Sequence, residues 1–104
     1  MYRVAVVLVT FNSAGAIGSC LDSLEKFAGL EIAVIDNASG DATKDEVRRR
    51  NLRLIANSTN RGFAAAVNQG VRETTAPVVL LLNPDVQLVR GLDAILTDLR
   101  MPTA

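Results

Sequence analysis

The chain contains no histidine and no tryptophan, and Cys20 is its single cysteine. Without histidine, a Ser-His-Asp triad and a His-ligated zinc site are both excluded. One cysteine cannot form a disulfide within these 104 residues, which fits a reducing compartment. The sequence also has no glycine-rich P-loop and no G-x-G-x-x-G after an apolar run, so ATP hydrolysis and dinucleotide binding have little support.

Net charge is absent as well, because eleven Lys and Arg balance eleven Asp and Glu. The run RRR at 48–50 is too short to form a basic surface, so no nucleic-acid partner is predicted. No segment approaches the roughly 20 apolar residues of a transmembrane helix. The apolar run at 4–9 is too short for a signal peptide, and no cleavage site follows it. We expect a cytoplasmic chain without a transmembrane segment.

With 104 residues, 49% of them hydrophobic, the chain has enough material for one domain spanning 1–104. Apolar runs alternate with segments of helical spacing, which predicts a Rossmann-like α/β fold: a mainly parallel sheet with helices on both faces. The predicted strands are residues 4–9, 32–35, 52–56 and 78–82. The first two predicted helices are Ile17 to Phe27, with Ser13 as N-cap, and the KDEVRRR segment at 44–50, capped by Asp41. The third is residues 63–73, where Phe63, Val67 and Val71 recur every four residues, and the last is Leu92 to Leu99.

The fourth run, VVLLL at 78–82, is followed by Asn83, Pro84 and Asp85. A continuous apolar run of this length is typical of a parallel strand buried on both faces. Pro84 lacks an N–H and ends the ladder, which leaves Asp85 beyond the carboxyl end of the strand. In open α/β sheets, ligands bind at this edge.

Polar side chains follow every predicted strand. If the strands are parallel, all four groups converge on one crevice, which would suit a ligand with hydrogen-bonding edges and negative charge. Alone, each group also has an ordinary explanation in turn chemistry or, at Gly62, in a positive φ. The groups are Thr10, Phe11 and Asn12; Asp36, Asn37 and Ser39; Asn57, Asn60 and Arg61; and Asn83 and Asp85.

The segments VVLVTFNS, AVIDNASGD, NRGFAAAVNQG and LLLNPDV, in this order and spacing, resemble the family 2 glycosyltransferases, particularly their rhamnosyltransferase-like branch. The resemblance runs from about Val4 to Leu99. It implies a nucleotide-diphospho-sugar transferase (GT-A) fold and transfer of a sugar from a nucleotide diphosphate donor to an acceptor hydroxyl with Mg²⁺ or Mn²⁺. The donor would be a UDP-sugar or dTDP-rhamnose, and the acceptor is not indicated.

The resemblance also implies roles for individual residues. Asp36 would accept the base N–H of uracil or thymine, and Asp85 would hold the divalent cation that bridges the two phosphates. Asn83 replaces the first acid of the family's Asp-x-Asp motif, so the metal would rest on one protein carboxylate. The implied nucleotide-binding residues are Thr10, Phe11, Asn12, Asp36, Asn37, Ser39, Asn60, Arg61, Gly62 and Asn83.

The family's catalytic base lies in the second half of its domain, so no catalytic residue is assigned here. We therefore expect the nucleotide-binding half of a glycosyltransferase domain, with little or no transferase activity alone. The strand at 78–82 would be left with an open edge or face, which predicts a homo-oligomer.

Two other interpretations stay open at this point. The C-terminal LDAILTDLRMPTA resembles the phosphoacceptor segment of receiver domains, with Asp98 in the acceptor position. A receiver also needs two acids after its first strand, and this strand ends in Thr10, Phe11 and Asn12. The other interpretation is a non-catalytic nucleotide-binding or assembly module on a similar scaffold.

Overall fold

The structure is a computed structural model and describes residues 2–89. Strands and helices alternate along the chain, as the sequence predicts. The predicted helix around Leu92 to Leu99, and Asp98 within it, lie outside the described residues. The elements are β1 (Val4–Thr10), α1 (Ala14–Leu24), β2 (Leu30–Asn37), α2 (Thr43–Arg48), β3 (Arg53–Asn57), α3 (Phe63–Arg72) and β4 (Val78–Leu82).

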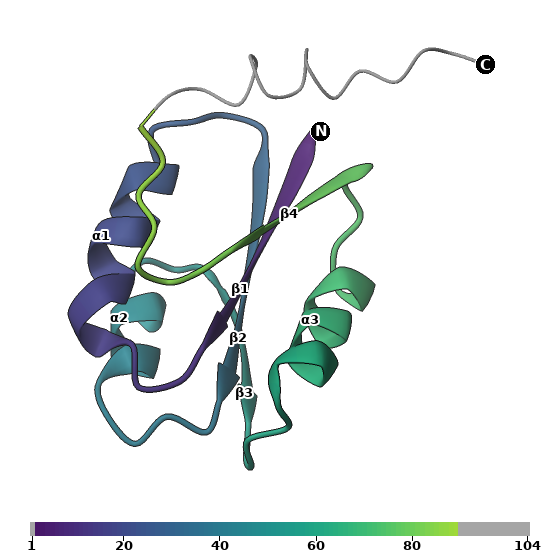
Figure 1. Cartoon of the computed structure of the whole chain (residues 1–104). Helices are drawn as coiled ribbons and strands as arrows, with labels where there is room; N and C mark the ends of the chain where they lie inside the picture. The colour runs from purple at the N-terminus through teal and green to yellow at the C-terminus, as the bar shows by residue number, and fades with distance from the viewer. Residues whose placement is uncertain (1, 90–104) are drawn as a thin grey trace.

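The strands form one parallel sheet in the order β3-β2-β1-β4. Helices α1 and α2 lie on one face of the sheet and α3 on the other (Figure 1). This three-layer arrangement confirms the predicted α/β fold with helices on both faces. No helix among residues 2–89 is long and apolar enough to cross a bilayer.

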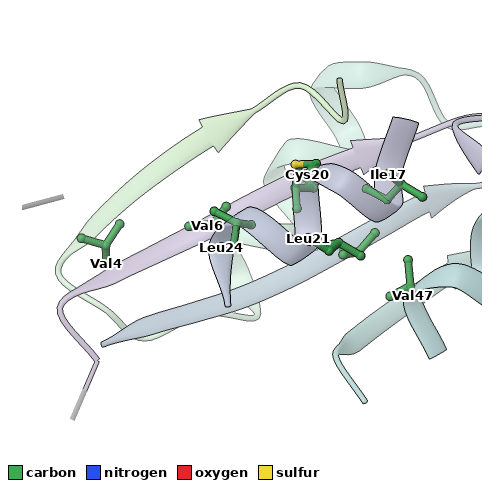
Figure 2. Packing of buried hydrophobic residues seen from close by; sticks show 9 residues of the cluster. Val4, Val6, Ile17, Cys20, Leu21, Leu24 and Val47 are labelled. Atoms are coloured by element: carbon green, nitrogen blue, oxygen red, sulfur yellow. The ribbon is translucent and has the colours of Figure 1, made fainter. Parts of the chain in front are cut away.

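Alternate residues of β1 enter two separate cores, because successive side chains of a strand point to opposite faces. Val4, Val6 and Leu8 pack against the buried face of α1, where Ile17, Cys20, Leu21 and Leu24 lie together (Figure 2). Val7 packs in the other layer with Ala33 and Ile35 of β2 and Ala66 of α3. The central strand is therefore covered on both sides.

The strand β4 departs from its prediction. The sequence predicted burial on both faces, but Val79 and Leu81 are 40% and 41% exposed. Val79 and Leu81 pair in register with Ala5 and Val7, so they lie on the α3 side of the sheet. They stay exposed because α3 packs over β1 and β2 rather than over β4. The two exposed side chains agree with the expectation of an open face at this strand.

The third helix also buries a different face from the one its large residues suggested. Phe63 is 56% exposed and Val71 42% exposed, whereas Ala66 and Gly70 are buried against the sheet. A Cβ on Gly70 would lie 2.4 Å from Val7 Cγ1, so only a residue without a side chain permits this approach. The helix therefore meets β1 and β2 through its smallest residues.

Two predicted helix starts need correction. Ser13 occupies the N-cap position of α1 but makes no side-chain capping bond. The N-cap position of α2 is Ala42, and Asp41, one residue earlier, still accepts from Thr43 N at the start of this helix. Helix α1 also stops at Leu24, before Phe27, and Gly29 follows with φ +78°. A positive φ is easiest for glycine and turns the chain into β2.

Candidate functional site

The polar groups that follow the strands lie at one edge of the sheet, as predicted. Thr10 at the end of β1 is level with Asp36 of β2, and Asn37 is level with Asn57 at the end of β3. The strand order reverses between β1 and β4, because β2 and β3 extend the sheet on one side of β1 and β4 on the other. Such a switch point is where open α/β sheets bind ligands.

Asp36 is fully buried and collects three hydrogen bonds. Thr10 Oγ1 donates to Asp36 Oδ1 at 2.7 Å, Ser39 Oγ donates to the same oxygen at 2.5 Å, and Ser39 N donates to Oδ2 at 2.9 Å. Asn12 N in turn donates to Ser39 Oγ at 2.9 Å, and Gly40 N donates to Asn12 Oδ1 at 2.8 Å. A buried carboxylate is tolerated only with such donors. Asp36 therefore joins the loops that follow β1 and β2.

Asp41 joins the starts of the two helices on this face. Its Oδ2 accepts from Ala14 N of α1 at 3.1 Å, and its Oδ1 accepts from Thr43 N of α2 at 3.0 Å and from Thr43 Oγ1. Thr43 Oγ1 also accepts from Ser13 N at 2.8 Å. The Thr43 hydroxyl bond, followed by the backbone bonds, lowers the pKa of the Asp41 carboxyl. Asp41 was predicted as a cap for α2 alone, and it serves both helix starts.

A set of side-chain amides lies on the opposite face of the sheet. Asn37 Oδ1 accepts from Asn57 Nδ2 at 3.1 Å and from Arg61 N at 3.3 Å, and Asn37 Nδ2 donates to Gly62 O at 3.1 Å. Asn57 exchanges two bonds with Gln69 of α3, at 2.8 and 2.9 Å. The adjacent residues Asp36 and Asn37 therefore organise different faces of the same edge.

The loop before α3 carries Asn60, Arg61 and Gly62, all exposed. Asn60 Oδ1 accepts from Gly62 N at 2.8 Å, and Gly62 has φ +83°, a conformation that favours glycine. Among residues 2–89, no carboxylate lies within ion-pair distance of the Arg61 guanidinium. Arg61 is thus a positive group available at the site edge.

A hollow of about 410 Å³ lies at the switch point, between the loops that follow β1 and β4. Asp85, on the rim of the hollow, is exposed. Phe11, which directly precedes the lining residue Asn12, is 53% exposed. Burial and, to a lesser degree, the negative charge of Asp85 raise the pKa of the Cys20 thiol beneath this region to about 11. The lining residues are Asn12, Ser13, Ala16, Asn83, Pro84 and Asp85.

The described residues contain no cluster of three or more His, Cys, Asp or Glu that could hold a metal ion by itself. Asp85 offers one exposed carboxylate in the hollow, beside the amide of Asn83. Mg²⁺ and Mn²⁺ prefer oxygen ligands, and Mg²⁺ is commonly held by one or two carboxylates together with substrate phosphates. These residues therefore fit a cation that arrives with a phosphorylated ligand.

Sequence reasoning missed Gln69 and the double role of Asp41. A signal for Gln69 exists in its spacing, since it shares a helix face with the buried Ala66 and Gly70. A polar residue on such a face needs a hydrogen-bond partner, and Asn57 provides it. Asp41 lies 27 residues from Ala14, so that contact depends on how the two loops meet.

Solved structures share this fold. The mannosyltransferase PcManGT from Pyrobaculum calidifontis, in complex with GDP-Man and Mn²⁺, is 32% identical with a TM-score of 0.76, over 84% of this chain and 29% of that one. S. aureus TarS 1–349 is 27% identical with a TM-score of 0.79, over 92% of this chain and 30% of that one. Both are GT-A glycosyltransferases, so this chain has part of the GT-A fold.

A curated relative, the glycosyltransferase AglE of Haloferax volcanii, is 28% identical over 79% of this chain and 30% of its own length. The chain thus spans about three tenths of the length of the relatives it matches. The sequence model of the family described as Glycosyl transferase family 2 matches residues 5–95. Because that match covers most of the sequence, the chain belongs to glycosyl transferase family 2.

Proposed function

We propose that this chain is the donor-binding region of a glycosyltransferase and binds a nucleotide diphosphate sugar. The observation that carries the proposal is the hollow at the switch point, where Asp85 and Asn12 share one rim and the network around Asp36 lies behind it. Structural neighbours support the donor class, since TarS has been solved with UDP-GlcNAc and PcManGT with GDP-Man.

The nucleoside part of the donor would lie against the loops that follow β1 and β2. Phe11 offers an exposed ring, and Thr10 and Asn12 form the wall, with Asn37 and Ser39 shaping the adjoining loop. Asp36 Oδ2 accepts one bond in the structure and can accept another from a base N–H. Because Asp36 has no exposed surface, we propose that the loop at Ser39 shifts when a base binds.

The diphosphate would lie between Asp85 and the loop of Asn60, Arg61 and Gly62. Asp85 would hold Mg²⁺ or Mn²⁺, with Asn83 beside it, and the phosphates would complete the coordination. When bound, such a cation neutralises the charge that develops on a diphosphate leaving group. Arg61 would supply a second positive charge from the opposite loop. Among residues 2–89, Asp85 is the only acid or base lining the hollow, and we assign no catalytic base.

The donor we propose carries uracil or thymine, as in a UDP-sugar or dTDP-rhamnose, in line with the rhamnosyltransferase-like motifs. Calorimetric titration with UDP, dTDP and GDP, with and without Mn²⁺, tests both the class and the base. We expect micromolar to millimolar binding, preferring UDP or dTDP. Preference for GDP would overturn the base assignment, and no binding by the folded chain would overturn the function.

Two variants and one control sharpen this test. Asp85→Asn should abolish the Mn²⁺ dependence of binding, and Asp36→Ala should weaken binding of nucleoside and nucleotide alike. Asp45→Asn is a matched control, because Asp45 is an exposed acid on α2. Equal loss of affinity in all three variants would show that net charge, rather than the site, governs binding.

The exposed side chains of β4 favour a second property, a homo-oligomer. Val79 and Leu81 continue the α3 side of the sheet beyond the helix, and β4 is an edge strand of the described sheet. We infer that two copies meet through this strand. Light scattering at high concentration should show a dimer that Leu81→Lys dissociates, and a monomer at all concentrations would refute it.

We also propose that the protein works in the cytoplasm. The supporting observation is the free thiol of Cys20, which lies buried in the core without a disulfide partner. A reducing compartment keeps such a thiol unmodified. Fractionation of cells that express the tagged chain should recover it in the cytoplasmic fraction, and recovery elsewhere would contradict the assignment.

A further inference from the structure

The loop that carries Arg61 is held by a chain of side-chain amides on the α3 side of the sheet. Asn37 is 3% exposed and Asn57 9% exposed, and both lie at strand ends on the α3 side of the sheet. Gln69 of α3 completes the chain, which we call the amide relay: Gln69, Asn57 and Asn37. None of its members lines the hollow.

The relay has a defined polarity. Gln69 Nε2 donates to Asn57 Oδ1, and Asn57 Nδ2 donates both to Gln69 Oε1 and to Asn37 Oδ1. Asn37 Oδ1 also accepts from the backbone N–H of Arg61, and Asn37 Nδ2 donates to Gly62 O, so these two backbone groups fix which end of the Asn37 amide faces the loop. The amide orientation of Asn37 is thus set by the loop backbone, and the pair of Asn57 with Gln69 of α3 supports Asn37 from the other side.

Asn37 contacts the backbone on both sides of the peptide bond that follows Arg61. Its Oδ1 accepts the N–H of Arg61, and its Nδ2 donates to the carbonyl of Gly62. Gly62 has φ +83°, and a Cβ there would meet nothing within 4 Å, so side-chain packing does not restrict this residue. The two bonds from Asn37, together with the bond from Gly62 N to Asn60 Oδ1, therefore supply the restraint that the glycine lacks.

We propose that Asn37 is a positioning residue, and that the amide relay presents the exposed Arg61 guanidinium to the diphosphate of the donor. This inference rests on the proposed function. Holding the loop in its binding geometry before the ligand arrives removes an entropic cost from binding. Asn37 itself touches no phosphate, and its effect on affinity passes through Arg61.

The substitution Asn37→Asp tests this role with little change in size. An aspartate keeps the oxygen that accepts from Arg61 N but places a second oxygen against Gly62 O, which repels it. We expect UDP to bind about tenfold more weakly, which corresponds to losing one hydrogen bond between the Arg61 guanidinium and a charged phosphate. The affinity for uridine, which has no phosphate, should stay within about twofold of the wild-type value. Weakening that is equal for UDP and uridine would indicate a merely structural role and overturn the inference.

A double-variant cycle gives the second readout. If Asn37 acts through Arg61, then Asn37→Asp combined with Arg61→Ala should bind UDP no more weakly than Arg61→Ala alone. Additive losses would overturn the inference. Gln69→Glu should reproduce part of the effect, about threefold, by disturbing the orientation of Asn57 from the far end of the relay. It is the second variant if Asn37→Asp fails to fold.

Asn51→Gly is the matched control, because Asn51 is an exposed asparagine with φ +56° at the opposite edge of the sheet. This variant should bind UDP with the same affinity as the wild type. Circular dichroism and thermal melts establish that each variant is folded. Absence of UDP binding by the folded wild type would overturn the proposed function and the inference together. Wild-type binding that Asn37→Asp and Gln69→Glu both leave intact would overturn the inference alone.

Discussion

Replacing Gly70 by alanine should destabilise the protein, although alanine is the better helix former. Gly70 is buried where α3 crosses β1, and an added Cβ would lie 2.4 Å from Val7 Cγ1, 3.2 Å from Val7 Cγ2 and 3.4 Å from Ile35 Cγ1. Ordinary contacts of this kind are 3.4–4 Å, so the shortest falls about 1 Å inside them. Val7 is fully buried and β-branched, and it cannot turn away freely.

Two opposing terms set the magnitude. Alanine in a helix interior is favoured over glycine by about 1 kcal/mol. Overpacking a close-packed core costs about 1–3 kcal/mol, and the steep overlap at Val7 suggests the upper part of that range. We therefore expect a net loss of about 1–2 kcal/mol, which corresponds to a fall in Tm of roughly 4–16 °C for a domain of this size.

Urea titration followed by circular dichroism measures this loss. Gly15→Ala is the control, since a Cβ on Gly15 of α1 meets nothing within 4 Å and should be neutral or stabilising by up to about 1 kcal/mol. The double variant Gly70→Ala with Val7→Ala should lose at least about 0.5 kcal/mol less stability than the sum of the two single losses, because alanine at position 7 leaves room for the added Cβ. A Gly70→Ala variant as stable as Gly15→Ala would refute the close approach of α3.

Three further predictions concern the loops at the site. Asp41→Asn should make stability depend less on pH in acid, because the pKa of Asp41 is lowered in the folded protein. Its stabilising contribution is present above the unfolded pKa near 3.8 and is lost as pH falls through the folded pKa, so thermal melts of the wild type and the variant should diverge in their pH dependence. Melts in which both proteins lose stability equally from pH 5 to 2 would contradict this. Thr10→Val keeps the shape but removes a bond to the buried Asp36 carboxylate, and denaturant titration should show a loss of about 1.5–3 kcal/mol. Gly62→Ala should cost about 1 kcal/mol through its φ of +83° alone, since a Cβ there meets no atom within 4 Å, and an unchanged unfolding midpoint would show that the loop relaxes.

Residue patterns predicted the order of the elements, the parallel sheet and the edge where the polar residues gather. These features follow from local information, because apolar runs, helical spacing and parallel crossovers leave few alternatives. Asp36 could be placed at the site for the same reason, since it ends a buried strand. The hydrogen bonds that its carboxylate accepts from Thr10 and Ser39 could not be predicted, because no periodicity in the sequence encodes those contacts.

The faces of β4 and α3 were not predictable by the same means. The run VVLLL is equally apolar at every position, so it does not indicate which side chains a neighbour covers. In α3 the large residues suggested the buried face, but close packing on Val7 favours Ala66 and Gly70 there. Both depend on the distance between a helix and a sheet, which is a tertiary property.

The divergence of Asp36 and Asn37 at the end of β2 makes the site unusually sensitive to changes in chain length. Side chains alternate with a period of two along a strand, so deleting or inserting one residue in β2 upstream of this pair would exchange their faces. The carboxylate would then enter the layer of Asn57 and Gln69, and the amide would meet Thr10 and Ser39. Substitutions can therefore retune either side of the site separately during evolution, whereas a single-codon insertion or deletion within β2 would disrupt both sides at once.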